Sequence, residues 1–253
     1  MKLFDSHCHF DFAPFEDDRE SLWSQCTEFG ICHLLIPGIE PAQWQSASYL
    51  SERFQGVLTA AGLNPWWLEK AQLPAPDDWY KALSAPLCVA VGECGLDAAI
   101  ETPMAKQEAV FSRHLEMAID SDLPLIIHVR QTHNETLRCL KRYCPPAGGV
   151  IHGFTGSREM AMEYWKLGFY LGVGGSITYP HANKTRMAIQ SMPLEALLLE
   201  TDAPDMPLYG FQGQPNSPLQ LLRVAQSLAE LVQQPVEEVA DQTTQNSYRL
   251  FDL

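Results

Sequence analysis

The segment MAKQEAVFSRHLEMAIDSDLPLIIHVR, residues 104–130, contains one complete helix-and-strand unit of the predicted fold. Residues 104–121 carry apolar and aromatic positions at three- and four-residue steps, the spacing of one helix face. These positions are Val110, Phe111, His114, Leu115 and Ala118. Residues 125–127 then form a short apolar run that is typical of a buried strand. The segment therefore predicts a helix followed by a strand that is covered on both faces.

The same alternation of apolar runs and amphipathic segments extends along the whole chain. The eight runs are residues 2–4, 33–36, 57–60, 88–91, 125–127, 149–151, 169–173 and 196–199. Near-continuous apolar strands separated by helices indicate a parallel sheet. Eight such units in 253 residues predict one α/β domain over residues 1–253, a closed (β/α)8 barrel of the TIM type. A doubly wound open sheet is the alternative, but it usually has a glycine-rich turn after its first strand.

Composition excludes several classes of protein. Hydrophobic residues make up 46% of the chain and charged residues 19%, a balance that a disordered chain does not have. There are 17 Lys and Arg residues against 31 Asp and Glu residues, so broad neutralisation of a nucleic-acid backbone is not expected. The seven cysteines include no CxxC pair, and no apolar run approaches the roughly 18–20 residues of a membrane span. These features predict a cytoplasmic protein that uses no membrane.

Six histidines and carboxylates follow the ends of five predicted strands. They are His7, His9, Glu93, His128, His152 and Asp202. Because the carboxyl ends of barrel strands converge on one site, these side chains are expected to lie together. Imidazole and carboxylate ligands suit Zn²⁺, Mn²⁺ and similar divalent ions, and six ligands exceed what one catalytic zinc uses. Two ions that share a carboxylate are therefore predicted. The other four histidines, His33, His114, His133 and His181, are interpreted as core residues.

Five motifs in order resemble the TatD family of metal-dependent hydrolases. They are DSHCHFD, VGECGLD, LIIHVR, IHGFTGS and LLLETDAPDMP, and the stretch PDMPLYGFQGQPN is most similar to the YjjV branch of that family. The resemblance implies that His7 and His9 bind one ion, with Asp202 completing that site, and that His128 and His152 bind the other. Glu93 would bridge the two ions. Where relatives have a histidine in Gly-x-His-Pro, this chain has Asn64, which is expected to contact substrate.

The resemblance also implies a substrate, a DNA end cut by a 3′-directed deoxyribonuclease. The expected chemistry is phosphoester hydrolysis by a water that two divalent ions (Zn, Mn or Mg) activate. Asp202 and Glu93 are the catalytic candidates, with Asp202 accepting the proton of the water and Arg130 holding a phosphate oxygen. Glu200 is a candidate for orienting a ligand. Hydrolysis of an amide, lactone or aminoacyl ester at the same site remains an alternative, as does a non-catalytic metal-binding role; no protein partner is predicted.

Overall fold

The structure is a computed structural model that describes residues 1–71 and 73–253. The strands are β1 (Leu3–Asp5), β2 (Ile31–Ile36), β3 (Val57–Ala61), β4 (Cys88–Asp97), β5 (Leu125–Arg130), β6 (Gly149–Ile151), β7 (Phe169–Val173) and β8 (Leu197–Leu199). The α-helices are α1 (Arg19–Glu28), α2 (Pro41–Arg53), α3 (Pro76–Leu83), α4 (Met104–Ser121), α5 (His133–Tyr143), α6 (Arg158–Lys166), α7 (Asn183–Gln190), α8 (Leu221–Val232) and α9 (Val236–Phe251). Within these described ranges, no helix has the length and apolar character to cross a membrane.

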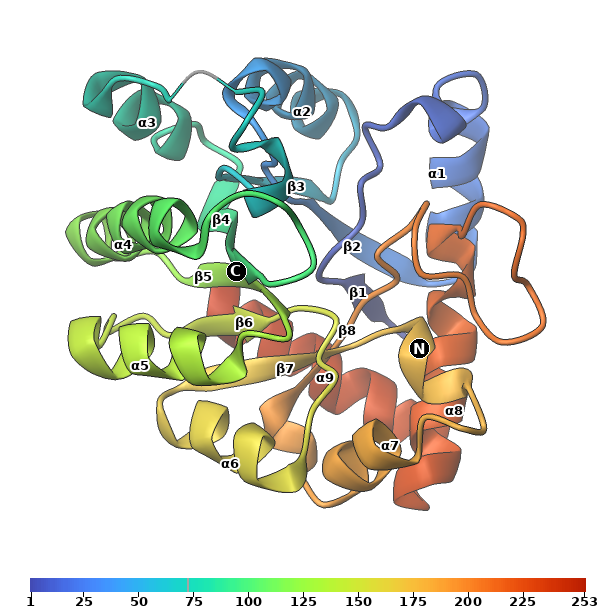
Figure 1. Cartoon of the computed structure of the whole chain (residues 1–253). Helices are drawn as coiled ribbons and strands as arrows, with labels where there is room; N and C mark the ends of the chain where they lie inside the picture. Colours follow the sequence, from blue (N-terminus) through green and yellow to red (C-terminus); the bar gives the residue numbers. More distant parts are fainter. Residues whose placement is uncertain (72) are drawn as a thin grey trace.

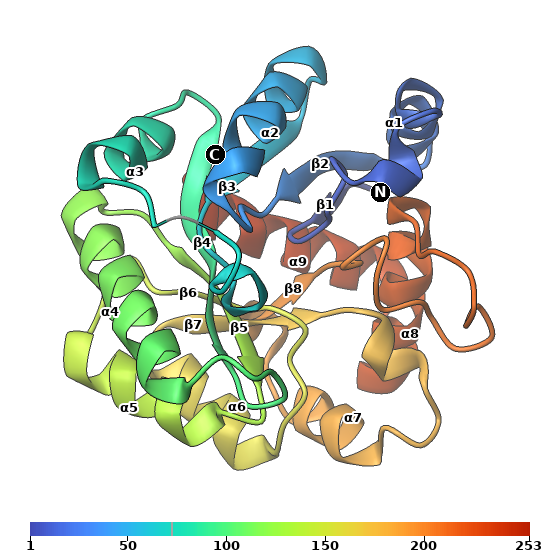
Figure 2. The ribbon, with the colours of Figure 1, turned by 45° about the horizontal axis from the view of Figure 1, so that its top comes forward.

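The eight strands form one parallel sheet in the order in which they follow along the chain, β1 to β8. The sheet closes between its first and last strands, where the Ser6 backbone N–H donates to the Leu199 carbonyl at 2.9 Å. The strands occupy the middle of the molecule and α2 to α7 surround them (Figures 1 and 2). The predicted (β/α)8 barrel is confirmed, and the doubly wound alternative is wrong. Assignment of residues 1–253 to one domain stays a prediction.

Apolar side chains from every strand fill the interior of the barrel. This inner cluster contains Phe4, Leu35, Leu58, Ala60, Ala90, Ile126, Val150, Tyr170 and Leu198. The end of α9 packs onto the same cluster, with the Phe251 ring 5.6 Å from that of Phe4, between ring centroids. α9 therefore covers the end of the barrel where the strands begin. The functional site is therefore expected at the opposite end of the barrel, where the strands finish and the βα loops start.

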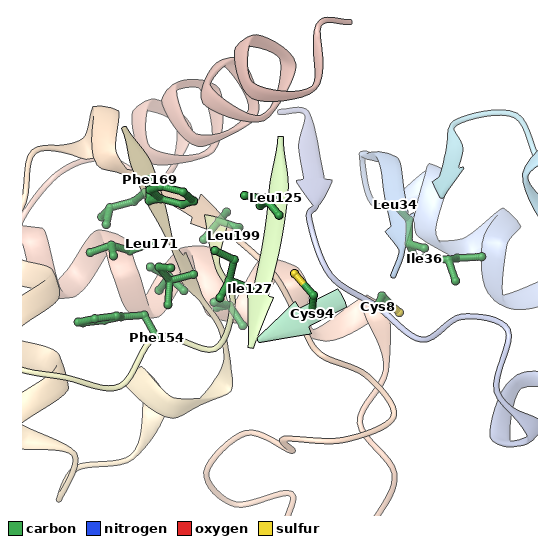
Figure 3. Packing of buried hydrophobic residues seen from close by; sticks show 14 of the residues in the cluster. Cys8, Leu34, Ile36, Cys94, Leu125, Ile127, Phe154, Phe169, Leu171 and Leu199 are labelled. Atoms are coloured by element: carbon green, nitrogen blue, oxygen red, sulfur yellow. The ribbon is translucent and has the colours of Figure 1, made fainter. Parts of the chain in front are cut away.

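The strand residues next in sequence to those of the inner cluster point outward against the helices, because side chains alternate between the two faces of a strand. Leu125 and Ile127 of β5 lie in this outer cluster, while Ile126 between them lies in the inner one. Figure 3 shows Leu125 and Ile127 together with Leu171 and Leu199 of β7 and β8. The same alternation turns His128 toward the interior, just beyond the apolar filling.

Most predicted elements agree with the structure, and the differences have local causes. α4 has the predicted bounds, and His114 is fully buried as expected. β4 continues to Asp97, six residues beyond the predicted end, because Gly92 and Gly95 allow the strand to continue close to its neighbours. The core interpretation of His181 is wrong, since its side chain is exposed after β7. His33 and His133 are only partly buried.

The buried His114 ring predicts a pH dependence of stability. Its Nδ1–H donates to the Val110 carbonyl at 2.8 Å and its Nε2 accepts the Leu63 N–H at 3.0 Å, so the neutral ring satisfies both contacts. Burial lowers the pKa of His114 to about 4 from its usual 6.5. The unfolded chain therefore binds a proton between these values that the folded chain does not, and stability falls as the pH decreases through that window.

We expect His114 to account for about 2 kcal/mol of the unfolding free energy lost between pH 7.5 and pH 5. Denaturant unfolding of metal-free parent and His114→Gln at both pH values measures this difference directly. His181→Gln, which changes an exposed histidine, is the control. An equal pH-dependent loss in parent and His114→Gln would show that His114 does not cause it.

Candidate metal centre

A change of register in β4 turns Glu93 into the barrel. Val91 pairs with Leu125 and Cys94 pairs with Ile127, so β4 has one more residue than β5 over this interval. An extra residue reverses the faces of all the residues that follow. Cys94 accordingly packs in the outer cluster, and Glu93 points to the interior with 1% of its surface exposed.

The segments after β1 and β8 bring His7, His9 and Asp202 together. The Nε2 atoms of His7 and His9 each lie 3.5 Å from Asp202 Oδ1. Two backbone hydrogen bonds hold these segments side by side, from Asp202 N–H to the His7 carbonyl at 2.8 Å and from His9 N–H to the Ala203 carbonyl at 2.8 Å. Three side chains from opposite ends of the sequence thus lie together at one position.

The Glu93 carboxylate connects this group to a second pair of histidines. Its Oε2 lies 3.4 Å from His7 Nε2, and its Oε1 lies 3.0 Å from His128 Nδ1 and 2.9 Å from His152 Nε2. The rings of His7 and His152 stack with their centroids 4.0 Å apart. All six predicted residues are therefore brought to one place, with Glu93 between the two groups.

The charges of the site favour a bound cation. Burial raises the pKa of Glu93, but the nearby imidazoles of His152, His128 and His7 outweigh burial and hold it well below its usual range. Burial likewise opposes protonation of His152, but Glu93, Asp202 and Glu200 raise its pKa to about 10. Burial lowers the pKa of His7 to about 4, so its ring is neutral and has a free lone pair.

The donor atoms also fit divalent metal. Candidate ligand atoms of His7, Glu93 and His152 lie within 4.8 Å of one another, as do those of His7, His9 and Asp202. Both ring nitrogens of His7 are buried without a hydrogen-bond partner among residues 1–71 and 73–253. Since an unpaired buried polar atom is costly, a cation at this position would satisfy a group that the surrounding protein leaves unpaired.

Comparison with known proteins places this chain in a family. The model of the family described as TatD related DNase matches residues 4–252. The chain belongs to the TatD family. This TatD-family chain is 42% identical to the uncharacterized metal-dependent hydrolase YjjV of Escherichia coli K12, over 100% of the chain and 98% of the relative. The crystal structure of that protein matches with a TM-score of 0.96, covering 99% of this chain and 98% of that one.

A more distant member carries a more specific name. The Klebsiella pneumoniae protein named 3′-5′ ssDNA/RNA exonuclease TatD is 29% identical, over 99% of this chain and 98% of the relative. The protein described here is therefore a metal-dependent hydrolase of the TatD type. The order and spacing of the five sequence motifs predicted this membership, which is confirmed.

Carboxylates behind the TatD-family histidines include one that the sequence analysis missed. His128 Nε2–H donates to Asp97 Oδ2 at 3.0 Å, which fixes the ring with Nδ1 toward Glu93. Glu200 lies behind His152, with its Oε1 3.9 Å from Nδ1 and accepting the Gly153 N–H. A carboxylate behind a ligating histidine orients the ring and raises its basicity. Asp97 ends the motif VGECGLD, four residues after Glu93. Alternate residues of a strand point to the same side, so this spacing was the signal that Asp97 lies on the same side as Glu93.

The buried Asp5 is a second residue that was missed, and its hydrogen bonds hold the segments that carry the site. Its carboxylate accepts from the backbone N–H and the hydroxyl of Thr201, at 3.0 and 2.6 Å, and from the His7 N–H at 3.3 Å. Burial raises its pKa to about 7 in spite of these bonds. Asp5 thus ties together the two segments that carry His7 and Asp202.

The two predicted substrate contacts lie in different surroundings. Asn64 is buried, and its amide donates to Glu93 Oε1 at 2.7 Å while its Oδ1 accepts the Trp66 N–H at 2.8 Å. Arg130 ends β5 with an exposed side chain at the rim of the barrel. Asn64 therefore lies within the candidate metal centre, and Arg130 lies outside it. Contact of either residue with substrate stays a prediction.

Proposed function

We propose that this protein is a phosphodiesterase that removes nucleotides from DNA ends, with two divalent ions at the candidate centre. The position of Glu93 carries the proposal, because its two oxygens face His7 on one side and His128 and His152 on the other. A carboxylate placed between two ligand groups suits a pair of ions. The family description and the name of the Klebsiella pneumoniae relative support the choice of nucleic acid as substrate.

The residues divide between the ions as two groups that share Glu93. His7, His9 and Asp202 would hold one ion, and His128 and His152 the other. When bound, such ions polarise a phosphoryl oxygen and lower the pKa of water. Their charge exceeds that of Glu93 and Asp202, so the centre attracts an anion although the whole chain has a net charge of −14.

Asp202 is the proposed general base. Burial raises its pKa, but a hydrogen bond from His9 and the nearby imidazoles of His7 and His152 outweigh burial and lower it. The carboxylate is thus ionised at neutral pH and ready to take a proton from the attacking water. Arg130, which is exposed at the rim, would hold a phosphate oxygen of the arriving end.

A substrate screen with metal-reconstituted full-length protein tests the proposed function. The substrates are single-stranded DNA with a free 3′ end, the same strand with a blocked 3′ end, closed circular DNA and RNA. A lactone, an aminoacyl ester and an N-acyl amino acid test the alternative chemistry. Release of nucleotides only from free ends supports the proposal. Activity on the small carboxylic substrates, with none on nucleotides, would replace it by the alternative.

The two-ion centre predicts a stoichiometry. We expect two divalent ions per chain after reconstitution, bound by His7, His9, Glu93, His128, His152 and Asp202. Elemental analysis counts the ions, and anomalous scattering from crystals locates them. One ion in the fully loaded protein, or ions bound away from these residues, would contradict the prediction. Unequal loss of the two under mild chelation would not, because their ligand sets differ.

A further inference from the structure

An exposed tryptophan lies beside the candidate metal centre. Trp66 belongs to the short 3₁₀ helix Pro65–Trp67, which follows β3 at the end of the barrel that carries the centre. Its side chain is 49% exposed, although a tryptophan has a large apolar surface. The centroid of its ring lies 6.3 Å from that of His128, in an edge-to-face arrangement. A flat apolar surface is thus open to solvent next to the proposed ligands.

Two hydrogen bonds hold this ring in place. The indole N–H donates to Asp97 Oδ2 at 2.6 Å, the same oxygen that accepts from His128 Nε2. The Trp66 backbone N–H donates to Asn64 Oδ1 at 2.8 Å, and the Asn64 amide reaches Glu93. Trp66 is therefore tied to the centre through both its side chain and its backbone. A ring fixed in this way loses little conformational freedom when a ligand covers it.

The neighbouring Trp67 shows how a purely structural tryptophan sits in the same turn. The Trp67 ring lies nearly parallel to Trp66, with centroids 6.5 Å apart, and packs against the outer hydrophobic cluster. Packing of the loop therefore uses Trp67, and the indole N–H of Trp66 is directed to the carboxylate behind His128 instead. The exposed face of Trp66 remains available to a ligand at the centre.

We propose that Trp66 is the platform on which the base of the terminal nucleotide stacks while its phosphodiester lies at the centre. The proposal rests on the proposed phosphodiesterase function and narrows its substrate to ends with an unpaired terminal base. A base that is paired in a duplex is held by its neighbours and cannot stack on the Trp66 ring. Aromatic stacking binds nucleotides without positive charge. This suits a chain with 17 basic residues against 31 acidic ones.

The test compares two single-stranded oligonucleotides that differ only in whether the terminal nucleotide carries a base or is abasic. Parent, Trp66→Ala, Trp66→Phe and the control Trp67→Phe are assayed with both. Removing one base–aromatic stack costs roughly 5- to 150-fold in affinity. We expect the parent to prefer the base-bearing end by a factor in this range, through KM more than kcat, and Trp66→Ala to lose the preference. Trp66→Phe, which keeps a ring, should retain most of it, and Trp67→Phe all of it.

A binding measurement without metal gives a second, independent result. A thymidine dinucleotide added to the metal-free protein should quench tryptophan fluorescence in the parent and in Trp67→Phe, and much less in Trp66→Phe. Equal kcat/KM for both ends in the parent, or an unchanged preference in Trp66→Ala, would overturn the platform while the phosphodiesterase function stands. Hydrolysis of neither oligonucleotide by the parent would reject the proposed function and the platform together.

Discussion

Asp202→Asn is expected to lower turnover by about 10²–10⁴-fold, the range that loss of a general base produces. The substitution keeps the size of the side chain but removes the charge that lies 3.5 Å from both His7 Nε2 and His9 Nε2. An amide cannot take the proton of the water, and it is a weaker ligand for a divalent ion. Initial rates at saturating metal and substrate measure the loss, and metal content is determined on the same samples.

Asp205→Asn is the matched control. It removes the same charge from an exposed side chain that stands three residues after Asp202. We expect its turnover to stay close to that of the parent. Should Asp202→Asn retain both ions and turn over within a few-fold of the parent, the proton must pass to another group. Circular dichroism on each variant shows whether the fold is intact.

The strand ends and their histidines could be predicted because both depend on local sequence. An apolar run followed by His128 or His152 specifies where a strand leaves the core, and parallel strands bring such positions to one end of the barrel. The family motifs then implied which residues act together. The structure agrees with this expected grouping, since the side chains of all six residues lie close together in space.

The supporting carboxylates could not be predicted in the same way, because they depend on register. Asp97 reaches His128 only because β4 continues past Glu93 and has one more residue than β5. Nothing in the apolar run 88–91 indicates this insertion. Asp5 was equally hidden, since a carboxylate at the end of a buried strand normally indicates a cap or a ligand. Its actual partners, the backbone and hydroxyl of Thr201, are 196 residues away.

Glu93→Gln is expected to weaken the binding of both ions strongly, since this carboxylate lies between the two groups of ligands. Loss of a residue that only orients a ligand costs about 10–100-fold in metal affinity, so loss of a shared ligand should cost more than about 100-fold. Isothermal titration calorimetry with Zn²⁺ and Mn²⁺ measures the affinities. Glu200→Gln makes the same change on the other side of His152, 3.9 Å from Nδ1, and should retain both ions with weaker binding.

The metal-free protein gives a sharper test of the same residue. Burial lowers the pKa of His152, and Glu93 is the foremost of the groups that raise it to about 10. Without the charge of Glu93, burial dominates, so the pKa of His152 should fall toward or below its usual 6.5 and the ring should be neutral at pH 7.5. NMR titration of the histidine ring protons detects this change, and Glu200→Gln should shift the pKa less. A His152 ring that stays protonated at pH 7.5 in Glu93→Gln would show that Glu93 does not control the charge of the site.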